Sequence, residues 1–227
     1  MERLIVFFFL IGLYYMAGID GEYWNAHTCP SDINEHIETL YAYAKECESV
    51  LELGVRGAVS SWAFLKGLAE NGRPRKTLVG VDLDYHPTIA RVQEAAAARD
   101  VDYTFVQGDD LAFDASARFD MTFIDTWHVY GQLKRELQRF APLTNKYIAM
   151  HDTTVDAVHG ESLRCGFNVE AQSQRTGIPA AEIARGLQPA IDEFLAAHPQ
   201  EWVVACVRQN NNGLTVLKRQ SPGKRTS

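Results

Sequence analysis

Short apolar segments alternate with helical segments along most of this chain, and this alternation constrains the fold more than any other feature. Five segments have the length and apolar composition of buried strands: 49–54, 77–84, 103–109, 119–125 and 146–152. The segments between them fit helices: 60–71, 87–99 and the stretch around Leu133, Leu137 and Phe140. Because strands that alternate with helices form crossover units, the pattern predicts a parallel sheet covered by helices.

The carboxyl-terminal part of the chain has a different pattern. Residues 202–208 and 214–219 are strand-like, and the connection between them ends in Asn212-Gly213, a pair that favours tight hairpins. We therefore expect an α/β fold: a Rossmann-like three-layer sandwich around a mostly parallel, seven-stranded sheet that ends in an antiparallel hairpin. A further helix is expected after Pro30, with Asp32 as its N-cap and Glu35 at capping-box spacing.

The first residues are more apolar than the rest of the chain. Residues 4–17 form an apolar run of 14 residues, shorter than the about 20 that a membrane-spanning helix needs. A membrane anchor, a signal sequence and an artefact of translation upstream of Met16 are the alternatives for residues 1–18. We expect a single domain over residues 19–218 and a basic, disordered tail over residues 219–227.

Charge and cysteine content narrow the class of protein. The chain has 22 Lys and Arg against 29 Asp and Glu, a formal net charge of −7, so general nucleic-acid binding is not expected. The cysteines show neither CxxC spacing nor a zinc-site pattern, and we expect four reduced thiols. A cytoplasmic location is expected, with anchoring through residues 4–17 as the open alternative; the oligomeric state is also open.

A loop with two glycines, Glu52-Leu53-Gly54-Val55-Arg56-Gly57, follows the first predicted strand and precedes a helix. Glycines let a backbone turn tightly and approach a ligand closely. A dinucleotide site has G-x-G-x-x-G, whereas this loop has an acid in place of the first glycine. An acid repels phosphate and suits a cation, such as a ligand that carries an ammonium and a sulfonium. This pattern disfavours an NAD-dependent oxidoreductase.

Two more acids follow the next two strands. Asp82 ends the second strand, where a carboxylate can accept hydrogen bonds from both ribose hydroxyls, and Asp109 follows Gly108, where it can accept from an adenine amino group. Because the carboxyl ends of parallel strands meet at one edge of a sheet, these acids are expected to line one crevice. The alternative is that Glu52 and Asp82 are only solvated strand ends.

The ordered set of these motifs resembles the class I S-adenosylmethionine (SAM)-dependent methyltransferases over roughly residues 31–218. Glu52, Gly54 and Gly57 match the first motif of that family, Asp82 its ribose-binding acid, and Gly108-Asp109 its adenine-side motif. The terminal hairpin is similar to the reversed last strand of the family. The resemblance implies SAM as cofactor and a cofactor-binding set of Glu52, Gly54, Gly57, Ser60, Asp82 and Asp109.

The ends of the fourth and fifth strands carry a second pattern, Asp125-Thr126-Trp127-His128-Val129-Tyr130 and His151-Asp152-Thr153. Two carboxylates at one rim, with a histidine nearby, can hold a hard divalent ion that lowers the pKa of a substrate hydroxyl. His128 can then act as general base, since the ordinary pKa of histidine lies near neutral pH. Alternatively, His128 only begins a helix and His151 is a core histidine.

This second pattern resembles the branch that contains macrocin O-methyltransferase and the cephalosporin-hydroxylase-like proteins, several of which methylate sugars with magnesium. The resemblance implies His128 and Asp125 as catalytic residues and Asp125, His151 and Asp152 as ligands of Mg or Mn. The chain departs from that branch at His151, where the sugar enzymes often have glutamate, and a nitrogen ligand favours a softer metal. It also departs at Thr126 and Trp127, and Trp127 either stacks on a sugar or packs in the core.

The resulting hypothesis is SAM-dependent O-methylation of a hydroxyl on a sugar or glycan. The alternatives are O-methylation of a phenol or catechol-like small molecule and a non-catalytic nucleoside-binding module. The loop after the fifth strand, with His159 and Glu161, is expected to cover the crevice, and the partner is a small-molecule or glycan acceptor.

Overall fold

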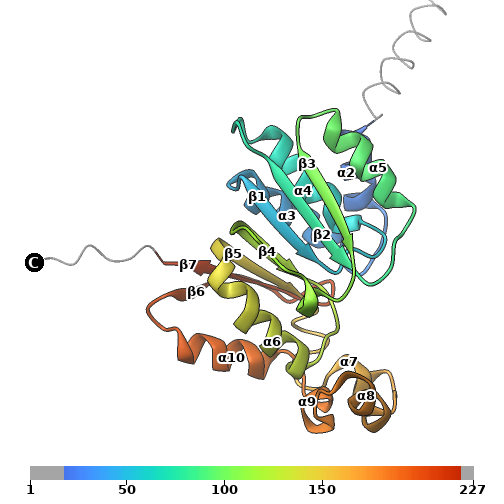
Figure 1. The fold of residues 1–227 in the computed structure, drawn as a ribbon, viewed down its shortest axis with the longest axis vertical. Helices are drawn as coiled ribbons and strands as arrows, with labels where there is room; N and C mark the ends of the chain where they lie inside the picture. The colour runs from blue at the N-terminus through green and yellow to red at the C-terminus, as the bar shows by residue number, and fades with distance from the viewer. Residues whose placement is uncertain (1–17, 221–227) are drawn as a thin grey trace, which may run out of the picture.

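The computed structural model describes residues 18–220, which form a central sheet with helices on both faces (Figure 1). The sheet has seven strands in the order β3-β2-β1-β4-β5-β7-β6, of which β1 to β5 are parallel and β7 is antiparallel to both neighbours. The strands are β1 (Ser49–Leu53), β2 (Thr77–Asp82), β3 (Asp102–Gln107), β4 (Phe119–Ile124), β5 (Thr144–His151), β6 (Trp202–Arg208) and β7 (Leu214–Arg219). The predicted fold class is confirmed.

Two hydrophobic layers enclose the sheet. On one face, α2 (Ile19–Thr28), α3 (Ile37–Lys45), α4 (Val59–Glu70) and α5 (Thr88–Ala97) supply the apolar side chains; on the other, α6 (Tyr130–Phe140) and α10 (Gln188–Ala197) do so. The helix α4 is buried on nearly every side, from Ser60 to Leu68. The loop before α4 is therefore held by a helix that has little freedom to move.

The carboxyl-terminal hairpin has the expected turn chemistry. Asn211, Asn212 and Gly213 all have positive φ, at 46°, 70° and 102°. Asparagine and glycine tolerate this left-handed region better than other residues, so the sequence can turn directly from β6 into β7. The predicted hairpin is confirmed.

The segment before β1 differs from the prediction. The helix α2 was not foreseen, and α3 begins at Ile37, after a short 3-10 turn η1 (Asn34–His36). Asp32 does not cap this helix, so the predicted capping box is wrong. Instead the Asn34 side chain accepts from the backbone N–H of Ser31 at 3.0 Å, and the Asp32 carboxylate pairs with Arg56.

Between β5 and α10 the chain forms a small helical layer, which we call the lid (residues 158–186). It contains α7 (Glu161–Arg164), α8 (Val169–Thr176) and α9 (Ala180–Ala184), and it lies next to the start of α6 (Figure 1). Backbone contacts fix its base: Gly160 donates to Ala184 O at 3.1 Å and Tyr130 donates to Arg185 O at 2.9 Å. The sequence analysis expected only a loop here. The remaining 3-10 turns are η2 (Asp110–Ala112) and η3 (Ala141–Leu143).

The proposed anchor, signal or artefact at residues 4–17 and the tail at 221–227 lie outside the described residues. The last strand continues through Arg219, which the sequence analysis had assigned to the tail. Across residues 18–220, every helix is too short or too polar to cross a membrane.

Candidate active site

A cavity of about 930 Å³ opens at the carboxyl ends of the parallel strands. Its walls come from the loop after β1, the ends of β2 and β3, the segment after β4, Asp152 after β5 and the lid. Open parallel sheets bind ligands at this edge, because the loops there diverge where the strand order reverses. Here β1 lies between β2 and β4, so the cavity sits at the reversal point.

Gly54 has the backbone conformation that the first loop requires. Its φ is 84°, and a Cβ atom at this position would collide with the carbonyl oxygen of Asp125. Gly57 differs, because a Cβ added there would meet nothing within 4 Å. Both glycines line the cavity. Gly54 is therefore needed for the close approach of two strand ends, and Gly57 leaves open space on the cavity wall.

Asp82 fixes the shape of the same loop. Its Oδ2 accepts hydrogen bonds from the backbone N–H groups of Val55 and Arg56, both at 2.7 Å. Its Oδ1 accepts from the backbone N–H of Asp84 at 3.1 Å. The Asp82 carboxylate lines the cavity and joins the end of β2 to the loop after β1. Its predicted contact with a ribose stays a prediction.

Glu52 lies beneath the loop and is fully buried, so it is not a solvated strand end. Its carboxylate accepts from the hydroxyls of Ser60 and Ser61 at 2.5 and 2.6 Å. Burial raises the pKa of Glu52 to about 8, although the two serine hydroxyls oppose this shift. Ser60 is on the cavity wall, whereas Glu52 is not. Glu52 is therefore mostly uncharged at neutral pH, in contrast to the prediction from the sequence. It can affect a ligand only indirectly, through the loop and Ser60.

The end of β3 presents two successive acids to the cavity. The exposed Asp109 caps η2 by accepting from the backbone N–H of Leu111 at 2.9 Å. The buried Asp110 accepts from Gln132 Nε2 at 3.1 Å through Oδ1, and its Oδ2 has no partner among the described residues. Burial raises the pKa of Asp110 to about 6. The sequence analysis did not select Asp110, because a sequence cannot show which of two adjacent acids points inward.

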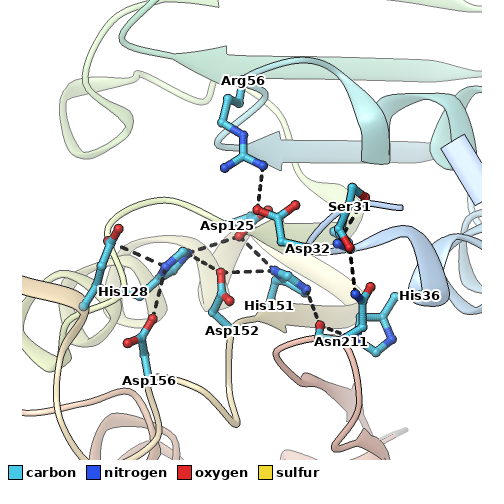
Figure 2. Close-up of polar contacts among 12 residues, drawn as sticks. Ser31, Asp32, His36, Arg56, Asp125, His128, His151, Asp152, Asp156 and Asn211 are labelled. Atoms are coloured by element: carbon cyan, nitrogen blue, oxygen red, sulfur yellow. Dashed lines mark hydrogen bonds and ion pairs between the residues drawn. The ribbon is translucent and has the colours of Figure 1, made fainter. Parts of the chain in front are cut away.

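Three predicted residues meet at the ends of β4 and β5, and we call them the acid–histidine cluster (Asp125, His128 and Asp152). Figure 2 shows one nitrogen of the His128 ring facing both carboxylates. The Nε2 atom of His128 lies 3.1 Å from Asp125 Oδ1 and 3.1 Å from Asp152 Oδ2. One ligand atom from each residue falls within 4.8 Å of the others, so the cluster has the donor set and the spacing of a metal site. Asp152 has φ of 55°, a left-handed conformation that directs the chain away from β5.

The other ring nitrogen of His128 faces acids from the lid side. Its Nδ1 lies 3.5 Å from Asp156 Oδ2 and 3.7 Å from Glu161 Oε2. Burial acts to lower the pKa of His128, but hydrogen bonds to Asp125 and Asp156 and the nearby negative charges outweigh it, so this pKa lies well above its usual value. The ring is therefore protonated at neutral pH before any ligand binds. The sequence analysis missed Asp156, which lies four residues after Asp152 and has no motif of its own.

His151 lies behind the acid–histidine cluster. The side chain is buried, is absent from the cavity wall and falls outside the group of close ligand atoms. Its Nδ1 lies 3.3 Å from Asp125 Oδ1 and 3.2 Å from Asp152 Oδ2, and its Nε2 lies 3.2 Å from the carbonyl oxygen of Asn211 (Figure 2). Burial opposes protonation, but the two aspartates raise the pKa of His151 to about 10. Both histidines therefore contact the same two carboxylates, and the role of His151 as a metal ligand stays a prediction.

Trp127 both packs against apolar neighbours and lines the cavity. Its ring lies against an apolar group of Val129, Ile178 and Ile183, and its Nε1 donates to Ser162 Oγ at 2.9 Å. Of the two loop residues in the sequence analysis, Glu161 lines the cavity and His159 forms an isolated bridge with Arg185.

Comparisons with known proteins show the fold. No protein-family model matches the sequence, and no curated protein matches it. Among solved structures, the O-methyltransferase TomG from Streptomyces achromogenes, involved in tomaymycin synthesis and in complex with SAM, is 15% identical, with a TM-score of 0.52 over 88% of this chain and 89% of that chain. The fold is shared with O-methyltransferases.

Two further structures are similar to the same extent. The methyltransferase PaMTH1 from Podospora anserina, bound to S-adenosylhomocysteine (SAH), is 15% identical, with a TM-score of 0.52 over 89% of this chain and 88% of that chain. The cofactor-bound Rv0187 from MTB is 18% identical, with a TM-score of 0.54 over 90% of this chain and 88% of that chain. At these identities the likeness concerns architecture alone.

Proposed function

We propose that this protein is a SAM-dependent O-methyltransferase. The observation that carries the proposal is one continuous cavity, which joins the glycine loop, Asp82 and Asp109 at one side to the acid–histidine cluster at the other. A nucleoside that carries a methyl sulfonium fits the first part, and a hydroxyl acceptor fits beside the cluster. The solved O-methyltransferases that share the fold and contain SAM or SAH support this assignment.

The cofactor end offers groups of the required kinds. The Asp82 carboxylate, which already accepts from two loop N–H groups, can also accept from ribose hydroxyls, and the exposed Asp109 can accept from an adenine amino group. The sequence predicts that a charged Glu52 favours a cationic cofactor. Because the pKa of Glu52 is about 8, the residue carries this charge only if it loses its proton when the cofactor binds. The other acids of the cavity supply the negative field that favours a sulfonium.

The acid–histidine cluster is suited to take a proton from an alcohol. In the transfer step the acceptor oxygen forms a bond to the methyl carbon, the methyl–sulfur bond breaks, and its electron pair stays on sulfur to give neutral SAH. The hydroxyl proton must go to a base, and His128 is the candidate because its neighbours make the ring strongly basic. The ring can accept this proton only in its neutral form, so the rate depends on how much of His128 is deprotonated.

A divalent ion fits the same group. Asp125, His128 and Asp152 would hold it, and one nitrogen donor with two carboxylates suits Mn more than Mg. When bound, such an ion polarises a hydroxyl and lowers its pKa. Coordination through His128 Nε2 would remove that nitrogen from proton transfer, so the roles of ligand and base compete.

The acceptor is proposed to be a hydroxyl on a sugar or glycan, with a phenol or catechol-like molecule as the alternative. A non-catalytic nucleoside-binding module is disfavoured by the intact acid–histidine cluster on the cavity wall. The test is incubation of the purified protein with labelled SAM and a panel of glycosides and phenols, with EDTA or with added Mn. Label transfer to any hydroxyl supports the proposal. Absence of SAM and SAH binding in calorimetry, or NAD binding of similar strength, would reject it.

A further inference from the structure

One helix of the lid forms a wall of the cavity. Gln172, Arg175 and Thr176, at the i, i+3 and i+4 positions of α8, line the cavity, and Phe167 lies in the turn just before this helix. Phe167 is 56% exposed and lines the cavity, so it is available to a bound ligand. A ligand in the cavity can therefore contact the aromatic ring of Phe167 and the guanidinium of Arg175 along this wall.

Arg175 differs from the other arginines of the cavity. Arg56 is paired with Asp32 at 2.6 Å. Arg135 is paired with Glu182 at 2.7 Å. The side chain of Arg175 is exposed and, among residues 18–220, has no hydrogen bond or ion-pair partner. It is thus a cation on the cavity wall with its donors free.

The cavity wall carries charges of both signs. Asp152, after β5, and Glu161, on α7 of the lid, face His128 with carboxylate oxygens 3.1 and 3.7 Å from the ring nitrogens. The free guanidinium of Arg175 lies on the lid side. An acceptor with an anionic group would be repelled by the acids and attracted to Arg175, so this arrangement would direct its other end, the hydroxyl, towards the acid–histidine cluster.

We propose that the acceptor is a hydroxylated ring that carries a carboxylate, with the carboxylate bound by Arg175 and the ring against Phe167. The planar fork of arginine matches a carboxylate with two parallel hydrogen bonds, which gives orientation as well as affinity. The inference rests on the proposed function and adds its substrate class. Both acceptor types considered above have such members: hydroxybenzoates among phenols and uronic acids among sugars.

The experiment compares probes that differ only in the carboxylate. Calorimetry on the SAH-saturated protein measures protocatechuate against catechol, and methyl glucuronide against methyl glucoside. In at least one pair the carboxylated member should bind about tenfold tighter or more. This preference should fall to within about twofold in Arg175→Gln and return in part in Arg175→Lys, because lysine keeps the charge but not the fork. The responding pair tells whether the ring is a phenol or a sugar.

Arg75→Gln is the matched control, because Arg75 is exposed and lies just before β2, at the edge of the sheet opposite to the cavity. It should keep the preference. Equal binding within both pairs, no binding of any probe, or a preference that survives in Arg175→Gln would overturn the inference while leaving the proposed function intact, provided that SAH binds. A loss of SAH affinity in Arg175→Gln would also overturn it, since Arg175 would then serve the cofactor.

Discussion

Nε2 of His128 lies 3.1 Å from Oδ1 of Asp125, three residues earlier in the connection between β4 and α6. Asp125 directly follows β4, and His128 lies in the turn before α6. The turn brings the ring back over the end of the strand, where the carboxylate holds it. The raised pKa of His128 therefore depends on the carboxylate at the end of β4 as well as on the histidine itself.

The first prediction concerns the pH dependence of methyl transfer. Because Asp125 and Asp156 raise the pKa of His128, the ring is protonated at neutral pH and becomes a base only as the pH rises. The single-turnover rate should increase with pH through the neutral and alkaline range. His128→Asn should lower the rate by about a hundredfold or more, with SAM affinity within about threefold of wild type. A rate near that of wild type would remove His128 from the role of base.

The second prediction separates the two possible nitrogen ligands of a metal. Added Mn should raise the melting temperature of the wild-type protein, because an ion that binds only the folded state stabilises it. The increase should disappear in Asp125→Asn and His128→Asn, whose side chains belong to the group of close ligand atoms. It should persist in His151→Gln, which has no place in that group. If His151→Gln alone abolishes the effect, the ligand set proposed from the structure is wrong.

The third prediction tests Asp82. Its Oδ2 holds two backbone N–H groups of the glycine loop, so Asp82→Ala should weaken SAM binding by about ten- to a hundredfold through loss of both the loop geometry and the ribose acceptor. Asp102→Ala is the control, because Asp102 is an exposed acid at the start of β3, on the opposite edge of the sheet. Equal calorimetric affinities for the two variants would remove Asp82 from cofactor binding.

A fourth prediction uses the two glycines of the same loop. Gly54→Ala should lower the free energy of unfolding by at least about 2 kcal/mol, because it forces a side chain into a positive-φ conformation and against the Asp125 carbonyl. Gly57→Ala has open space around the new Cβ and should leave stability almost unchanged while weakening SAM binding. Denaturant unfolding and calorimetry of both variants check this contrast. Similar losses of stability in the two would contradict it.

The fifth prediction concerns stability and Glu52. Burial raises the pKa of Glu52 from 4.5 to about 8, so the folded protein binds this proton more tightly than the unfolded chain. The stabilisation that this bound proton gives to the folded state is fully present below pH 4.5 and is lost as the pH rises towards 8. Over this range the wild-type protein loses this stabilisation, whereas Glu52→Gln has no such proton to lose. The free energy of unfolding of Glu52→Gln minus that of the wild type should therefore increase with pH, by up to about 1.4 kcal/mol per pH unit. Glu38→Gln, at an exposed helix position, is the control and should follow the wild type.

Local patterns in the sequence were sufficient for the sheet and for most residues of the site. The strand predictions agree with the structure to within a few residues, since buried apolar runs and the Asn212-Gly213 turn act locally. The acids at the strand ends share one edge because parallel strands all point the same way, so Asp82, Asp109, Asp125 and Asp152 could be brought together without coordinates.

Side-chain direction and pairing depend on contacts between distant segments, and these appear only in the tertiary structure. Glu52 is covered by α4 and loses its charge at neutral pH, and Asp110 turns inward beside Gln132. His151 contacts the Asn211 carbonyl in the hairpin turn beside β5 and is absent from the cavity wall. The lid also has weak local signals, because its short helices are held by contacts with α6 and the loop after β5. Burial and neighbouring charge set the protonation of each group, and neither is encoded at a single position of the chain.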